Sequence, residues 1–254
     1  KAVELVEKAM APLGPDYLAN LQKGLTSGWI DIYENVGKTS GAYSWGAYGV
    51  HPFVLLNYQE NLDNVFTLAH EMGHALHSFY TWANQPYIYG GYTIFVAEVA
   101  STLNETLLTD YLLKTVEDKK LKLYVINHYL EQFRGTVYRQ TMFAEFEKII
   151  HEKAEAGEPL TPDLLCQVYR KLNEDYYGPD MIIDREIELE WARIPHFYNA
   201  FYVYKYATGF SAATALAKQI LDQGQPAADR YLDFLKSGSS DYSINLLKKA
   251  GVDM

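Results

Sequence analysis

The segment Asn61–Trp82 constrains the fold of this 254-residue chain more than any other part of it. Its apolar residues cover most sides of the predicted helix, so the helix has to be buried. They are Phe66, Leu68, Ala69, Met72, Ala75 and Leu76. The same helix carries His70, Glu71 and His74, and burying such polar groups is unfavourable unless they find partners. The fold must therefore supply partners for polar groups inside its core.

His70 and His74 are four residues apart, which places their side chains on one helix face, about 6 Å from each other. Two imidazoles at this spacing can bind one zinc ion. Glu71 then lies beside the site, where its carboxylate can act as a general base rather than as a ligand. The alternative is a core helix whose histidines only hydrogen-bond to neighbours, in which Gly73 would destabilise the helix by about 1 kcal/mol without benefit. We interpret the run as a site for one Zn²⁺ per chain.

The third protein ligand distinguishes the classes of zinc hydrolase. Metzincins continue with a glycine and a third histidine at positions that His77 and Tyr80 occupy here, so that class is excluded. Glu98 lies 24 residues after His74, early on a second predicted helix, and completes a His, His, Glu set with one open position. Glu105, seven residues further on the same face, could be the ligand instead. We expect it rather to accept a hydrogen bond from a ligand histidine.

A di-iron carboxylate site is a further chemical alternative, because Glu71 and His74 also form the Glu-x-x-His pair of such sites. Those sites need two such pairs. No other glutamate in the chain has a histidine three positions later, so the sequence favours the single zinc ion.

Helical patterns account for most of the remaining chain, which predicts a mainly α fold in one domain. The exception is Thr39–Tyr58, where glycines, aromatic and β-branched residues and Pro52 predict one or two short strands. Two short helices are expected before it, separated by Pro12–Pro15, and a loop is expected at Asn84–Gly91. Further helices are expected at Phe95–Leu113, Lys119–Ala156, Thr161–Tyr176, Glu186–Arg193, Tyr202–Leu221, Ala227–Leu235 and Tyr242–Ala250.

Composition excludes several kinds of partner. The net charge of −10, without any cluster of Lys and Arg, argues against nucleic acid. No apolar stretch approaches the roughly 18 residues of a membrane-spanning helix, so no membrane contact is expected. The single Cys166 cannot form an internal disulfide, which makes a reducing, cytoplasmic location the simplest expectation.

The segments 66–77 and 95–105 resemble oligoendopeptidase F, a branch of the thimet-oligopeptidase-like zinc metallopeptidases. The resemblance covers most of the chain and extends to residues 41–44, 51–52, 194–198, 201–204 and 208–211. It implies a zincin-like helical catalytic domain with a small β-sheet beside the active-site helix, and cleavage of oligopeptides in a deep channel. In the family, the glutamate at the position of Glu98 binds zinc. Family members are much longer on the N-terminal side, so residues 1–254 would be the catalytic portion of a longer chain.

The resemblance also assigns substrate contacts to a segment C-terminal to the zinc site. In the family, a histidine and tyrosines there contact the substrate carbonyl; by position these are His196 and Tyr204, with Tyr198 a weaker match. Imidazole and phenol groups can donate hydrogen bonds to the oxyanion that forms during peptide hydrolysis. The sequence 199–201 replaces the more glycine-rich loop of related peptidases, which leaves the register of the tyrosines open. Without the resemblance, His196 in an aromatic run is typical of a core histidine.

Together these observations predict an endopeptidase that hydrolyses internal bonds of oligopeptides through a metal-activated water, with Glu71 as general base and His70, His74 and Glu98 as ligands. A non-catalytic zinc- or peptide-binding fragment of such an enzyme is the alternative from another class. Zinc content measured beside peptide hydrolysis separates the two.

Overall fold

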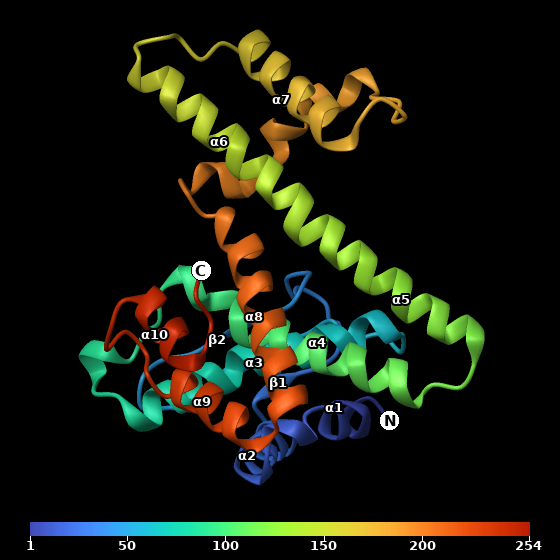
Figure 1. Ribbon diagram of the computed structural model, residues 1–254, viewed down its shortest axis with the longest axis vertical. Helices are drawn as coiled ribbons and strands as arrows, with labels where there is room; N and C mark the ends of the chain where they lie inside the picture. Colours follow the sequence, from blue (N-terminus) through green and yellow to red (C-terminus); the bar gives the residue numbers. More distant parts are fainter. The chain divides into compact units, whose positions relative to one another are not determined.

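The computed structural model describes residues 1–254, and most of them are helical (Figure 1). The chain divides into two compact units, each with its own hydrophobic core. The first combines Lys1–Asn127 with Thr208–Met254, and the second is His128–Ala207. The mainly α fold with a small sheet, expected from the sequence, is confirmed. No helix is both long enough and apolar enough to span a bilayer.

Two helices of the first unit begin where the sequence provides the chemistry for a helix start. Pro15 opens the second helix at a position where a missing N–H has no consequence. Asn61 caps the third, with its side-chain oxygen accepting the Asn64 N–H at 2.9 Å. The helices are α1 (Ala2–Ala9), α2 (Pro15–Thr26), α3 (Leu62–Asn84), α4 (Ala97–Thr115), α9 (Gln225–Leu235) and α10 (Ser243–Ala250), with 3-10 turns at Ala11–Leu13, Tyr87–Tyr89 and Ile94–Val96.

A three-stranded sheet lies beside α3, which contacts β2 and β3. β2 (Tyr43–Trp45) pairs antiparallel with the central strand β3 (Phe53–Leu55), so the strands expected within Thr39–Tyr58 are present. β1 (Ile30–Asp31) pairs parallel with β3 and was not expected. A two-residue strand is too short to show the alternation from which strands are recognised.

Helix α3 is the centre of the first unit's core and packs against α4 through Gly73. A Cβ atom at Gly73 would lie 2.6 Å from both the Ala100 carbonyl oxygen and the Ser101 Cα. The two helices approach so closely only because this position has no side chain. Gly73, which weakens an isolated helix, therefore has a packing reason.

The second unit is built mainly from α6 (Arg139–Glu155) and α7 (Pro162–Tyr177). Helix α5 (Lys119–Phe133) enters it from the first unit, and α8 (Tyr204–Gln223) leaves it. A π-helical turn, Arg134–Tyr138, interrupts the single helix expected over Lys119–Ala156. The expected helix Glu186–Arg193 is a 3-10 segment, Arg185–Arg193, followed by another at Pro195–Tyr198. The core contains Met142, Phe143, Phe146, Tyr169, Leu172, Ile194 and Val203.

Candidate metal centre

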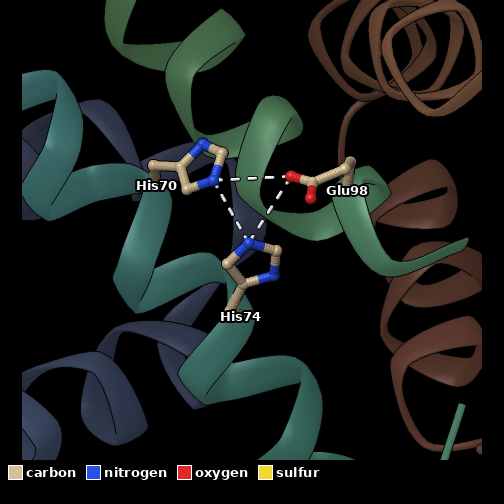
Figure 2. A group of neighbouring side chains, drawn as sticks. All are labelled: His70, His74 and Glu98. Carbon is tan, nitrogen blue, oxygen red and sulfur yellow. Dashed lines mark hydrogen bonds and ion pairs between the residues drawn. The ribbon is translucent and has the colours of Figure 1, made fainter. Parts of the chain in front are cut away.

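Three side chains from α3 and α4 converge in the first unit (Figure 2). His70 and His74 lie one turn apart on α3, and their Nε2 atoms are 3.1 Å from each other. Glu98, in the first turn of α4, brings its Oε2 atom to 3.4 Å from Nε2 of His70 and 3.5 Å from Nε2 of His74. The three atoms form a nearly equilateral triangle.

The triangle matches the face of a tetrahedron around a small metal ion. Zinc binds imidazole nitrogen and carboxylate oxygen at about 2.0–2.1 Å, which sets the ligand atoms of a regular tetrahedron about 3.3 Å apart. The observed separations of 3.1, 3.4 and 3.5 Å bracket that value. The set can therefore hold one ion on three protein ligands and leave a fourth position open.

Glu105 fixes the orientation of the His70 ring. Its Oε1 atom contacts Nδ1 of His70, the ring nitrogen that is not part of the triangle. An N–H at Nδ1 that donates to this carboxylate leaves the lone pair of Nε2 directed at the metal position. Burial lowers the pKa of His70, but Glu105, Glu98 and Glu71 outweigh it and raise that pKa to about 9. The surrounding carboxylates thus favour positive charge at this place, as a metal cation would supply.

Glu71 lies beside the triangle and is not one of its corners. Its side chain is 6 % exposed, and its Oε2 atom is buried without a hydrogen-bond partner. Burial raises the pKa of this carboxyl, and the two neighbouring histidines oppose that effect. A buried carboxylate oxygen without a partner is unfavourable for folding alone, which makes Glu71 a candidate functional residue.

Two small residues shape the surroundings of Glu98. The hydroxyl of Ser101, one turn further along α4, lies 3.1 Å from Glu98 Oε2, the atom at the corner of the triangle. On another side, helix α8 approaches through Gly209, where a Cβ atom would lie 3.0 Å from the Glu98 Cβ. Neither residue was given a role from the sequence. Gly209 acts through packing between helices that only the folded chain creates, whereas the contact of Ser101 with Glu98 is local to α4 and follows from their three-residue spacing.

A buried polar chain connects α2, α4 and α3 behind the site. The Tyr17 hydroxyl donates to Asn104 Oδ1 at 2.9 Å, and Asn104 Nδ2 donates to the Ala69 carbonyl at 3.0 Å. Tyr17 and Asn104 are completely buried. Ala69 precedes His70, and Asn104 lies between Glu98 and Glu105. These hydrogen bonds therefore fix the register of the two helices that carry the site.

Comparison with known proteins shows the family of the chain. The model of peptidase family M3 matches residues 2–254. The chain belongs to this family. It is 61% identical over its full length to the oligopeptidase PepF of Bacillus subtilis, of which it covers 38%. It is 51% identical to an oligoendopeptidase F homolog of Lactococcus lactis, over 99% of the chain and 42% of that protein.

Solved structures lead to the same family. A putative peptidase from Chlamydophila abortus matches with a TM-score of 0.86 and 47% identity, over 99% of this chain and 42% of that one. The oligoendopeptidase-F of Enterococcus faecium matches with a TM-score of 0.72 and 44% identity, over 99% of this chain and 38% of that one. The resemblance to oligoendopeptidase F is confirmed, and the chain spans about two fifths of the length of these relatives.

The other expected site residues of this M3 chain lie in the second unit. His196 belongs to the 3-10 turn Pro195–Tyr198, and its Nε2 atom lies 3.3 Å from the hydroxyl of Tyr206. Tyr198 is 79 % exposed and donates to the Ala192 carbonyl at 3.2 Å, while Tyr204 begins α8. The structure thus brings Tyr206, a residue that the sequence did not distinguish within its aromatic run, into contact with His196.

Proposed function

We propose that this chain is the catalytic portion of a zinc-dependent endopeptidase that hydrolyses internal bonds of short peptides. The observation that carries the proposal is the triangle of His70, His74 and Glu98, with the unpartnered carboxylate of Glu71 beside it. Family M3 membership and the names of the relatives, oligopeptidase and oligoendopeptidase, support it. The short-peptide substrate class is inferred from those names.

His70, His74 and Glu98 would hold the zinc ion. When bound, the ion would act as a Lewis acid that lowers the pKa of a water molecule to about 7. Glu105 keeps the His70 ring in the tautomer that exposes Nε2. Glu71 takes the proton of the attacking water on its carboxylate and passes it to the departing amine. Ser101 holds the Glu98 carboxylate in place by a hydrogen bond.

His196 and Tyr204 are proposed to donate hydrogen bonds to the oxygen of the attacked carbonyl, with Tyr198 as a further candidate. Tyr206 joins this set because its hydroxyl contacts the His196 ring. Replacing a tyrosine of this set by phenylalanine, or His196 by glutamine, should lower kcat while the zinc content stays the same. Wild-type kcat in all of them would remove the segment from the mechanism.

Glu71→Gln tests the central role in the complete natural protein. We expect stoichiometric zinc by elemental analysis, and a loss of about 10²–10⁴-fold in the hydrolysis of an internally quenched peptide. Glu60→Gln, at an exposed position before α3, removes the same charge and should be silent. Unchanged turnover of Glu71→Gln would refute the general base. Peptide binding without hydrolysis by zinc-loaded wild type would instead support the non-catalytic alternative.

The cytoplasmic location expected from the lone Cys166 stays a prediction. Fractionation of cells that express the natural gene would test it.

A further inference from the structure

Phe201 adopts a backbone conformation that phenylalanine disfavours. Its φ is 57°, and no other non-glycine residue of the chain has a positive φ. In this left-handed region a Cβ atom crowds the following carbonyl, so glycine usually occupies such positions. Phe201 is also 55 % exposed, so burial of its ring does not explain the conformation. Something else must hold the backbone here.

Glu147 of α6 supplies that hold within the second unit. Its Oε1 atom accepts a hydrogen bond from the Phe201 N–H at 2.6 Å, and Glu147 is only 3 % exposed. Its neighbours in the chain, Met142, Phe143 and Phe146, belong to the unit's hydrophobic core. A carboxylate in such surroundings is unfavourable unless its hydrogen bonds are made. The hydrogen bond to Phe201 therefore stabilises both the buried carboxylate and the turn.

His151 adds a second contact from the same helix face. It follows Glu147 by one turn and bonds through Nδ1 to the Glu147 carbonyl oxygen, 2.7 Å away. Its ring lies 4.6 Å, centroid to centroid, from the ring of Phe201. Helix α6 thus holds both the backbone and the side chain of Phe201.

The turn at Phe201 brings His196 into contact with the tyrosines that follow it in the sequence. His196 precedes the turn, whereas Tyr202 and Tyr206 follow it. The ring centroids of His196 and Tyr202 are 5.3 Å apart, and the Tyr206 hydroxyl lies 3.3 Å from His196 Nε2. A reversal of the chain between residues 198 and 202 is needed for these contacts, and the left-handed residue lies within it.

We propose that Glu147 is a positioning residue for peptide hydrolysis. By holding Phe201 in the left-handed conformation, its carboxylate fixes His196 against the tyrosines that follow the turn. The inference rests on the proposed function only for its effect on catalysis. The conformational claim stands on the geometry of the second unit alone.

A pair of substitutions at Phe201 tests the conformational requirement. Phe201→Gly and Phe201→Val both remove an exposed ring, but glycine accepts a positive φ and β-branched valine resists it. In the complete natural protein with full zinc, we expect kcat for a quenched peptide to be about tenfold higher in the glycine variant than in the valine variant. Equal kcat in the two variants would overturn the proposal.

Substitutions at Glu147 test the anchor itself. Glu147→Leu removes the acceptor, and we expect it to lower kcat about tenfold with zinc content unchanged. Glu147→Gln keeps an acceptor oxygen and should restore most of that loss. In a Phe201→Gly background, where the turn needs less support, Glu147→Leu should lower kcat by only about twofold. The control Glu152→Gln removes an exposed carboxylate of the same helix and should leave kcat unchanged. An equal loss in both backgrounds would show that Glu147 serves general stability, and would overturn the proposal.

Hydrogen exchange separates this inference from the proposed function. The peptide covering residues 198–203 should exchange faster in Glu147→Leu and Phe201→Val than in wild type, and nearly at the wild-type rate in Glu147→Gln. That pattern in a protein without peptidase activity would support the turn and refute the function. An active protein whose exchange at 198–203 does not respond to these substitutions would refute the turn and leave the function intact.

Discussion

Glu98 and Glu105 lie on one face of α4, yet they have different places at the site. Glu98 faces Nε2 of both histidines, whereas Glu105 contacts Nδ1 of His70 alone. The difference follows from the crossing of α4 over α3 at Gly73, which brings the first turn of α4 to the metal position. A carboxylate behind a ligand histidine tunes the ligand without touching the ion.

Removal of Glu105 should therefore weaken the metal site without abolishing it. We expect Glu105→Ala to lower zinc affinity about 10–100-fold, because the His70 ring loses the partner that fixes its tautomer. Competition with a chromogenic chelator measures the change. Glu117→Ala, at an exposed site beyond the end of α4, is the matched control. Unaltered zinc affinity in Glu105→Ala would contradict this role.

The sequence predicted the three side chains that the structure brings together at the candidate metal centre. For the two histidines, helical periodicity and the chemistry of zinc ligands were enough. The choice of Glu98 also drew on the family resemblance, because the spacing left Glu105 open as the ligand. Ser101 and Asn104 received no role from the sequence, and Tyr206 was one of several undistinguished tyrosines of its run. The role of Asn104 depends on which helices cross, and the contact of Tyr206 with His196 depends on the turn between them, so no local pattern of residue types carries that information. Ser101 could have been found from its three-residue spacing to Glu98.

At the scale of the elements, the α3–α4 crossing depends on Gly73. We expect Gly73→Ala to destabilise the protein by about 1–3 kcal/mol in urea unfolding, and to lower zinc affinity more than tenfold. The added Cβ atom would lie 2.6 Å from backbone atoms of α4. This clash can only be relieved by moving α3 and α4, which carry the candidate ligands, apart.

Gly135→Ala is the matched control for this change. Gly135 is also helical, and a Cβ atom there would meet nothing within 4 Å. Alanine at that position should change stability by no more than about 1 kcal/mol, because it affects only backbone entropy. If the two alanine variants were equally stable, the tight crossing at Gly73 would not be a constraint.

The Tyr17–Asn104–Ala69 chain locks the same helices by hydrogen bonds. Tyr17→Phe leaves Asn104 Oδ1 buried without its donor, so we expect a loss of about 1–3 kcal/mol in the free energy of unfolding. Tyr242→Phe removes a hydroxyl from a side chain that is 83 % exposed and should change stability by less than about 0.5 kcal/mol. Equal stabilities of the two variants would show that the buried chain contributes nothing.

Helices were more predictable than the other elements for a physical reason. Helix α3 repeats its apolar pattern over 23 residues and begins after the capping Asn61, so its period and its start are both encoded locally. The two-residue strand β1 is defined only by its partner β3. The segment Arg185–Arg193 has helical spacing, but its backbone is 3-10, and composition cannot distinguish the two in one short run.

At the scale of the whole chain, the two units differ in how they are stabilised. The first has one extended apolar core, whereas the second has a small core and a charge network around the buried carboxylate of Glu190. Both oxygens of Glu190 are bonded there: Oε1 accepts from Arg139 at 2.6 Å and also from Arg193, and Oε2 accepts from Tyr169 at 2.6 Å. The stability of the second unit should therefore depend on the charge of Glu190, and so on pH.

Burial raises the pKa of Glu190, but Tyr169, Arg139 and Arg193 together outweigh it and hold the value below 4.5. A carboxyl whose pKa is lower in the folded state stabilises the fold above the unfolded pKa, and the effect is lost as pH falls through the folded value. We expect the second unit to lose stability as the pH falls below about 4.5.

Glu190→Gln isolates this contribution. We expect the variant to be less stable than wild type by about 1–3 kcal/mol at pH 7, because a neutral amide pairs less well with two guanidinium groups. The gap should narrow between pH 5 and about pH 3 as Glu190 of the wild type takes up its proton. Urea unfolding can be followed by the fluorescence of Trp191, the neighbour of Glu190, taken as the difference from a Trp191→Phe reference. Because the other tryptophans, Trp29, Trp45 and Trp82, lie in the first unit, this difference reports on the second unit. A gap that stayed constant over the same pH range would mean that the Glu190 network does not cause the acid sensitivity.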